Sequence, residues 1–302
     1  MNDRTPDLEL TRPAREMWEL PLSKRTRLLT ERYRLHPKKR LGQSFLVNDQ
    51  AAARLADVVG ETEPPGVVEI GGGLGALTVA IARRLPRARL IVYEVDTALC
   101  QALADVLAPI SRRCWVHCCD FLKASHEEAG ATDEWALVGN LPYSLTTPIL
   151  ESIFSASLRW RTVVLMVQRE FAQRMIAGPG SHTYGALSLF TQANCEQVER
   201  VMRLKPSSFW PKPEVESVVL RICLRRHPPE CIEDSALFET VVRGAFNYRR
   251  KTLVRALVTA GVLGATEEQV QSAVAAAGLD PVQRPETLSL EEFAALTSAL
   301  SG

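Results

Sequence analysis

The segment Asn140-Leu141-Pro142-Tyr143 holds residue types that could grip an amine and aim it at a reacting carbon. Asn140 offers a side-chain carbonyl oxygen, and Pro142 favours an extended Leu141 whose own carbonyl can face a pocket. Tyr143 adds a flat face for stacking. Two oxygen acceptors beside a ring suit the exocyclic amine of a nucleic-acid base, which would then attack an electrophilic methyl group. A strand-ending turn with a buried Tyr143 is the simpler alternative.

The side chains of this segment can act together only if buried strands hold the segment in place. The apolar run 136–139 predicts a buried strand that ends at Asn140, and open α/β sheets keep functional residues just past their strand ends. A second apolar run, 67–70, leads into a glycine-rich turn and a helix expected over 74–85. The glycines of this turn are Gly71, Gly73 and Gly75, beside Gly72. They allow a ligand to approach the backbone closely, and they fit a nucleoside loop or, with Ala76, a dinucleotide fingerprint.

Acidic residues end the next two predicted strands. Glu94 follows the apolar run 89–93 and lies about twenty residues past the glycines, where a carboxylate can accept hydrogen bonds from ribose hydroxyls. Asp120 ends the run 114–119, where it could hold the amine of an adenine or simply cap a turn. The alternation of strands and helices predicts a doubly wound parallel sheet. A nicotinamide-dependent enzyme would use the first two strand ends, whereas a methyltransferase would use all four.

The chain divides into three expected parts. Residues 1–36 form a basic N-terminal extension with no clear core, and residues 37–227 contain the predicted sheet. From 228 to 302 the apolar period becomes helical, which predicts a small all-α domain. Its expected helices cover 235–247, 249–260, 267–277 and 290–300.

Basic residues gather in two places. The first group precedes the sheet and comprises Lys38, Lys39 and Arg40. The second group lies in the C-terminal domain and comprises Arg243, Arg249, Arg250 and Lys251. In this domain Arg243, Asn247, Lys251 and Arg255 are spaced by four, which predicts one shared helix face. Such groups are usually solvated, and contact with RNA phosphates is the second interpretation, since few acids are interleaved.

Composition sets limits on function. With 46% apolar residues, 24% charged residues and a net charge of +1, the chain is ordinary for a globular protein and has no global attraction to nucleic acid. No apolar run has the length of a membrane span, and the first residues lack a signal peptide, so we expect a cytoplasmic protein. The 7 cysteines are irregularly spaced, which predicts buried thiols rather than a metal site or a disulfide framework.

Phe209 precedes a loop that is stiffened by Pro211 and Pro213. Its ring could pack into the core, or it could close over a base opposite Tyr143. In the second case the base leaves its stack at a cost of a few kcal/mol. Base–aromatic stacking of roughly 1–3 kcal/mol per base would offset that cost. No strong base is needed in such a reaction, because positioning supplies most of the rate gain.

Together these motifs resemble the ribosomal RNA adenine dimethyltransferases, the KsgA/Dim1 group. The matching segments are 39–46, 69–75, 140–143, 184–185, 209–217 and 245–252. The resemblance runs from His36 to the C-terminus and leaves the N-terminal extension uncovered. The chain departs from the family pattern at Ser44, Ser144 and Tyr248, where the family commonly has Asn, Asn and Gln.

The resemblance implies a Rossmann-like class I methyltransferase sheet and dimethylation of adenine N6 with S-adenosylmethionine. The family's target is two adjacent adenines in the 3′-terminal hairpin of small-subunit rRNA, so the implied partner is an immature 30S subunit, bound in part by the C-terminal helices. A monomer without a membrane or metal partner is expected. The implied catalytic residues are Asn140, Leu141, Pro142, Tyr143 and Phe209. The implied cofactor residues are Gln43, Ser44, Leu46, Gly71, Gly73, Gly75, Glu94, Asp120 and Asn140.

Three alternatives stay open. A sister family dimethylates large-subunit rRNA, and its motif commonly has Ile where Leu141 stands. A non-catalytic RNA-binding factor of the same fold would not need the intact segment 140–143. A nicotinamide-dependent oxidoreductase would need a catalytic histidine–acid pair, for which the sequence offers no obvious candidate.

Overall fold

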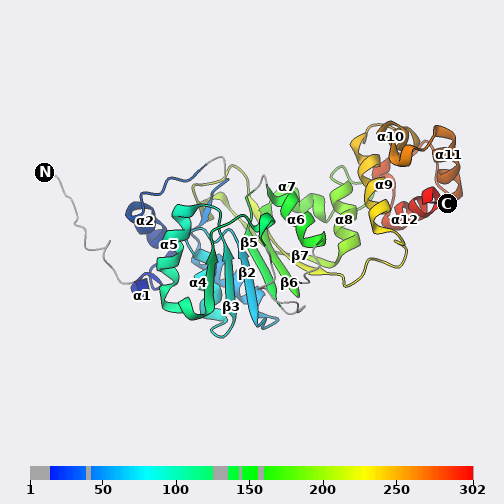
Figure 1. The fold of residues 1–302 in the computed structure, drawn as a ribbon. Helices are drawn as coiled ribbons and strands as arrows, with labels where there is room; N and C mark the ends of the chain where they lie inside the picture. The colour runs from blue at the N-terminus through cyan, green and yellow to red at the C-terminus, as the bar shows by residue number, and fades with distance from the viewer. Residues whose placement is uncertain (1–13, 39–41, 125–134, 143–144, 156–159, 302) are drawn as a thin grey trace. The chain divides into compact units, whose positions relative to one another are not determined.

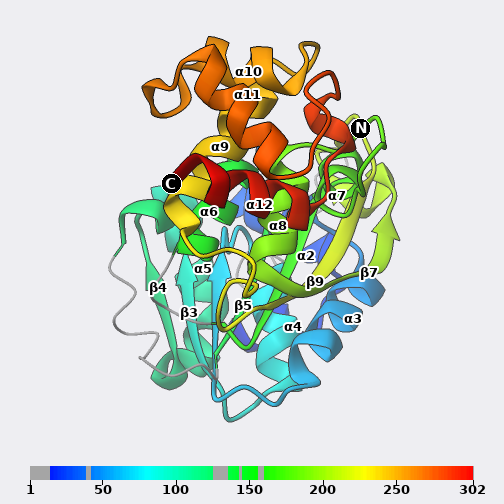
Figure 2. The same ribbon diagram turned by 90° about the vertical axis from the view of Figure 1, so that its right-hand side faces the viewer.

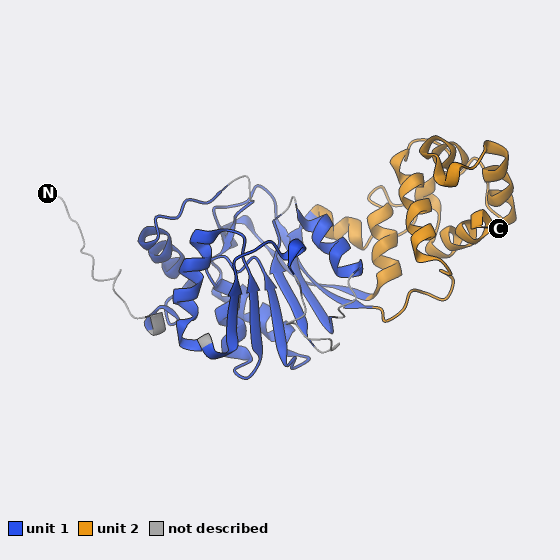
Figure 3. Ribbon diagram, in the orientation of Figure 1, with its two compact units in different colours: residues 1–169, 197–224 blue, residues 170–196, 225–302 orange. Residues whose placement is uncertain are grey.

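The structure is a computed structural model that describes residues 14–38, 42–124, 135–142, 145–155 and 160–301 (Figure 1). The chain forms two compact units, the first from residues 1–169 and 197–224 and the second from residues 170–196 and 225–302 (Figure 3). This division differs from the expected boundary after residue 227, because residues 170–196 make most of their contacts with the C-terminal helices.

A seven-stranded sheet forms the centre of unit 1, in the spatial order β4-β3-β2-β5-β6-β9-β7. Its strands are β2 (Gly66–Ile70), β3 (Arg89–Tyr93), β4 (Cys114–His117), β5 (Ala136–Asn140), β6 (Thr162–Gln168), β7 (Cys195–Leu204) and β9 (Ser217–Leu224). The strands from β4 to β6 in this order are parallel, and β9 runs antiparallel to β6. The predicted doubly wound parallel sheet is therefore confirmed, with an antiparallel addition beside β6. Central strands β2 and β5 are almost entirely buried, as expected for unbroken apolar runs in a parallel sheet.

Helices pack on this sheet and hold its strand ends in place. Helices α3 (Asp49–Gly60) and α4 (Ala76–Arg84) pack against each other, and α5 (Thr97–Leu107) packs against β4 (Figure 2). Helix α6 (Thr146–Ser155) follows β5. Asn48 caps α3 by accepting a hydrogen bond from the Ala51 N–H at 3.0 Å.

Residues 14–36 are part of unit 1, which corrects the expectation of an extension without a core. This segment contains α1 (Ala14–Met17) and α2 (Leu22–Arg32), and both contribute to the main core. Their buried apolar side chains are Met17, Leu22, Leu28 and Leu29. The inward face of α2 is hidden in the sequence because it also carries Arg25, a residue type that is rarely buried.

Unit 2 is helical and has a core of its own. Its helices are most of α7 (Arg169–Met175), then α8 (Ala186–Asn194), α9 (Ser235–Asn247), α10 (Leu253–Ala260), α11 (Glu267–Ala276) and α12 (Leu290–Ser301). Tyr184 is fully buried in this core, and its hydroxyl donates a hydrogen bond to the Leu288 carbonyl at 2.9 Å. The all-α prediction for this part of the chain is confirmed.

One helix of unit 2 begins later than expected. The chain turns between Tyr248 and Thr252, and α10 starts at Leu253, where the sequence favours a start at 249. Arg243 therefore lies on α9 while Lys251 lies in the turn. The helix face expected to carry both residues is not formed.

The cysteines also differ from expectation. Cys100 in α5 and Cys118 after β4 form a disulfide, whereas Cys119 and Cys231 are exposed thiols. The prediction that all cysteines are buried thiols is therefore wrong. Strand β4 ends at His117, so Cys118 and Cys119 are not held in the buried strand that the sequence predicts. Within the described ranges, no group of acidic, histidine and cysteine side chains could hold a metal ion, and no helix is long and apolar enough to cross a membrane.

Candidate functional site

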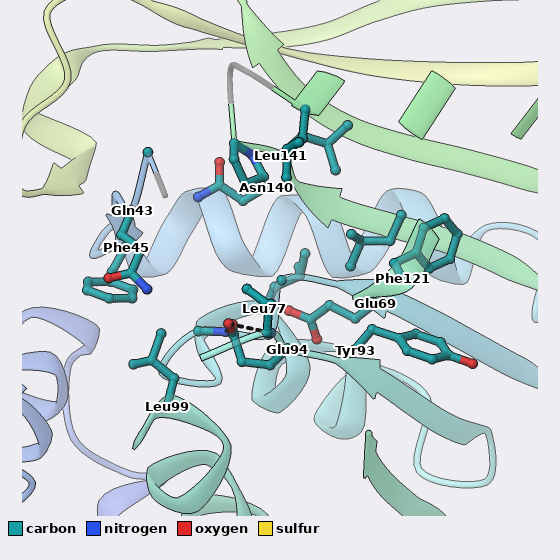
Figure 4. A pocket seen from close by; sticks show the side chains of 18 of the residues that line it. Gln43, Phe45, Glu69, Leu77, Tyr93, Glu94, Leu99, Phe121, Asn140 and Leu141 are labelled. Carbon is teal, nitrogen blue, oxygen red and sulfur yellow. Dashed lines mark hydrogen bonds between the residues drawn. The ribbon is translucent and has the colours of Figure 1, made fainter. Parts of the chain in front are cut away.

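A cavity lies at the carboxyl ends of β2, β3 and β5, where the sequence predicts functional residues. In Figure 4, Asn140 lies across this cavity from Glu94, with Gln43 and Phe45 on one side and Tyr93 and Phe121 on the other. The predicted cofactor residues that line it are Gln43, Ser44, Leu46, Gly71, Gly73, Glu94, Asp120 and Asn140. Gly75 lies behind this lining, at the start of α4. The structure thus brings together side chains that are far apart in the sequence.

The glycine turn depends on backbone conformations that other residues rarely adopt. Gly71, Gly73 and Gly75 have φ values of 74°, 54° and 72°. A Cβ atom at Gly73 would lie 3.2 Å from the Phe45 ring. The turn therefore keeps its backbone open to a ligand at the amino end of α4.

Glu94 is held rigidly at the end of β3. Its carboxylate accepts hydrogen bonds from the N–H groups of Gly73, Val95 and Asp96, each at 2.9 Å. Burial raises the pKa of Glu94 above its usual value, and these backbone donors oppose the shift. An acid fixed to the glycine turn can present its remaining lone pairs to ribose hydroxyls.

Asp96 organises a second polar group beside this acid. It accepts a hydrogen bond from the Gln43 amide at 3.0 Å and pairs with the Lys38 ammonium at 2.8 Å. Burial alone would raise the pKa of Asp96, but the hydrogen bonds from Lys38 and Gln43 lower it below its usual value. Lys38, expected to contact RNA, is thus engaged with a carboxylate of the protein. Lys39 and Arg40 lie outside the described residues.

Asn140 ends β5 with a fixed amide orientation. Its Nδ2 donates to the Ser44 carbonyl at 2.8 Å, so the side chain presents Oδ1 as an acceptor. Leu141 packs its side chain into the core, and the Pro142 carbonyl accepts from the Leu145 N–H at 2.9 Å. Tyr143 lies outside the described residues.

Phe209 packs inward, the first of its two sequence interpretations. It is 3% exposed, pairs with Leu46 between the short strands β1 (Phe45–Leu46) and β8 (Phe209–Trp210), and does not line the cavity. The next residue, Trp210, is 41% exposed and stacks on Phe45 with ring centroids 6.2 Å apart. The closure of Phe209 over a base is therefore not present in this structure.

Sequence reasoning missed Glu69, a buried acid that also lines the cavity. Its carboxylate accepts a hydrogen bond from the Thr78 hydroxyl at 2.5 Å, and burial raises its pKa to about 8. A carboxylic acid inside an otherwise apolar strand is unusual, and that contrast is the signal from which the residue could have been found.

We expect Glu69 to make stability fall as pH rises. Its pKa is raised on folding, so the folded state holds the proton more tightly and loses stability from pH about 4.5 up to about 8. Glu69→Gln cannot titrate at this position and should lack this slope. The melting temperature of the wild type should therefore fall relative to that of the variant over this pH range, and the difference should stay constant at higher pH. Thermal unfolding between pH 4 and 9 measures the difference. Glu230→Gln, an exposed acid, is the control, and parallel curves for the wild type and Glu69→Gln would contradict the expectation.

The basic residues of unit 2 are largely engaged within that unit. Arg243 pairs with Glu239, and Arg249 donates to the His182 carbonyl at 2.6 Å. Lys251 donates to the Thr259 hydroxyl at 3.0 Å. Arg250 is exposed. All four side chains reach the surface of unit 2, and the contacts of Arg243, Arg249 and Lys251 limit the directions in which those three can point.

Comparisons with known proteins find related sequences over most of the chain. Residues 34–296 match the family model described as ribosomal RNA adenine dimethylase. The chain is 40% identical over 283 residues to the ribosomal RNA small subunit methyltransferase A of Geobacillus sp. (strain WCH70), covering 91% of this chain and 96% of the relative.

Two solved structures share the fold. The dimethyladenosine transferase from Plasmodium falciparum superposes with a TM-score of 0.68 at 22% identity, over 83% of this chain and 95% of the other. The 23S rRNA methyltransferase ErmE superposes with a TM-score of 0.61 at 24% identity, over 85% of this chain and 100% of the other.

Proposed function

Because the chain belongs to the ribosomal RNA adenine dimethylase family, we propose that it dimethylates N6 of two adjacent adenines in the 3′-terminal hairpin of small-subunit (16S) rRNA. It is an S-adenosylmethionine-dependent methyltransferase with a class I sheet. The observation that carries the proposal is the position of Asn140, which faces the same cavity as the glycine turn and Glu94. The proposed acting form is a monomer that meets an immature small subunit in the cytoplasm.

The cavity fits S-adenosylmethionine. The glycine turn offers an open backbone, Glu94 offers carboxylate oxygens to a ribose, and Asp120 lies where an adenine amine would need an acceptor. Phe45, Tyr93 and Phe121 supply apolar walls. When bound, this cofactor supplies an electrophilic methyl group.

The protein's part in the reaction is to position and stabilise the attacking amine. Oδ1 of Asn140 accepts one N6–H, and its Nδ2 bond to the Ser44 carbonyl prevents the amide from turning over. The Leu141 carbonyl is the proposed second acceptor, the shape of Pro142 holds that backbone, and Tyr143 is the proposed stacking ring. The amine becomes cationic as it attacks, so two nearby oxygens stabilise the charge that develops. Its proton then leaves to water, and the remaining lone pair allows a second transfer.

Unit 2 is the proposed RNA-binding part of the chain. Arg250 and Arg255 are exposed there, and exposed cations can contact phosphates without reading sequence. For Phe209 the proposed role is positioning instead of closure over a base, because it pairs with Leu46, which lines the cavity.

Methylation of purified, unmodified small subunits with labelled S-adenosylmethionine tests the substrate. We expect label in two adjacent adenines near the 3′ end of the small-subunit rRNA, located by nucleotide mapping, and none in large subunits treated alike. Label in large-subunit rRNA alone would favour the sister family. No label in either, with RNA still bound, would favour a non-catalytic factor.

A further inference from the structure

Arg25 is a buried charge that reaches the glycine turn from outside the cavity. It lies on α2, is 2% exposed, and donates through a guanidinium nitrogen to the Gly75 carbonyl at 3.0 Å. This helix precedes the region matched by the family model, which begins at residue 34. A segment outside the matched region therefore contacts the loop at the centre of the site.

The contact between Arg25 and the Gly75 carbonyl has two free-energy costs, so its presence needs an explanation. Burying a guanidinium removes it from water, and burial together with the nearby Arg83 lowers the pKa of Arg25 to about 10. In addition, Gly75 is the N-cap of α4, and a cation is unfavourable at the amino end of a helix. The contact is therefore not explained by stabilisation of α4. What it does provide is a second donor to the Gly75 carbonyl, which also accepts the first backbone hydrogen bond of α4, from the Val79 N–H at 3.1 Å.

Hydrogen bonds connect the residue Gly75, through its N–H rather than its carbonyl, to the ribose-facing acid. The Gly75 N–H donates to the Gly72 carbonyl at 2.9 Å, and the Gly73 N–H donates to a Glu94 oxygen at 2.9 Å. The position of Gly75 therefore affects the positions that Glu94 and the glycine turn take relative to a bound ligand. Asp49 anchors the start of α2 by accepting from the Leu22 N–H at 3.1 Å, so the helix is tied to unit 1 at its amino end.

We propose that Arg25 is a positioning residue that holds the glycine turn in its cofactor-binding shape. The inference rests on the proposed function of that turn as the S-adenosylmethionine site. It assigns helix α2 to the cofactor site, although none of its residues lines the cavity.

Calorimetric titration of full-length Arg25→Met with S-adenosylmethionine tests the proposal. Loss of a buried hydrogen bond from a charged group predicts a dissociation constant about tenfold larger, with RNA affinity unchanged. Arg25→Lys, which keeps the charge and a donor, should recover most of the affinity. If the Met variant does not fold, hydrogen exchange of amides 71–79 in Arg25→Lys is the readout, and faster exchange than in the wild type is expected.

Two control variants separate positioning from general stability. Arg83→Met removes a neighbouring cation whose guanidinium donates to the Trp18 carbonyl, whereas that of Arg25 donates to the Gly75 carbonyl. Leu29→Ala weakens the packing of α2 and leaves Arg25 in place. Both should bind S-adenosylmethionine within about twofold of the wild type, a change well below 1.4 kcal/mol.

Wild-type cofactor affinity in Arg25→Met would overturn the proposal, as would wild-type exchange in Arg25→Lys where exchange is the readout. The proposal would also be overturned if Leu29→Ala lost as much affinity as Arg25→Met while showing a similar fall in melting temperature. Glu94→Ala separates this failure from a failure of the proposed function. If it alone loses affinity, only the role of Arg25 is wrong, whereas unchanged affinity in both variants would show that the turn is not the cofactor site.

Discussion

Asn140→Ala should lower methyl transfer to small-subunit rRNA by about 10²–10³-fold, the size seen when one oriented polar group is removed from a charged transition state. The reason is that Oδ1 of Asn140 is the acceptor fixed by the Nδ2 bond to the Ser44 carbonyl. Binding of S-adenosylmethionine should weaken only modestly, because the glycine turn and Glu94 stay intact. Single-turnover methylation and calorimetry measure the two effects separately.

Asn194→Ala is the matched control for this prediction. Its amide also donates to a backbone carbonyl, that of Phe190 at 2.8 Å, but it does not line the cavity. It should therefore methylate at the wild-type rate. Asn140→Asp keeps an acceptor oxygen and loses the donor to Ser44, so its rate should lie between those of the wild type and Asn140→Ala. Normal turnover in Asn140→Ala would remove the residue from the mechanism.

Glu94→Ala should weaken S-adenosylmethionine binding about a hundredfold, since hydrogen bonds to a charged group contribute roughly 1.5–3 kcal/mol each. The variant loses the proposed ribose acceptor, and it also leaves the N–H groups of Gly73, Val95 and Asp96 without their carboxylate. The turn then loses one of its attachments as well as a ligand contact. Equilibrium dialysis with labelled cofactor gives the dissociation constant.

Glu196→Ala, an exposed acid outside the cavity lining, is the control for Glu94→Ala and should bind like the wild type. Glu94→Gln should fall between them, because the amide keeps one acceptor oxygen. A change of less than about threefold in Glu94→Ala would mean that the ribose does not meet this carboxylate.

The strand ends were predictable because each apolar run in the sequence stops at a glycine or a polar residue. Glycines follow β2, Glu94 follows β3 and Asn140 ends β5, so the sequence shows both the strand and its functional terminus. The helices of unit 2 were predictable from their apolar spacing. The late start of α10 was not, because the residues from 249 to 251 are themselves tolerated in helices.

Other features depend on tertiary contacts that no local pattern reveals. Strand β7 has mostly exposed or half-buried residues, so it lacks both the apolar run and a clear alternation. Lys38 could not be separated from its basic neighbours without knowing that Asp96 lies beside it. Phe209 had two reasonable positions, and its pairing with Leu46, far away in the chain, decides between them.

The late return of the chain to the sheet has a consequence for how the protein can be divided. Residues 170–196 leave unit 1 after β6, the chain returns to the sheet with β7, and only β9, from residue 217, lies beside β6. A fragment that stops at 227 would keep the whole sheet yet strip α8 of the helices that cover it, leaving Leu189 bare and the Tyr184 hydroxyl without the Leu288 carbonyl. The C-terminal helices are therefore not a separable appended domain, because part of their core is encoded between strands β6 and β7 of the sheet.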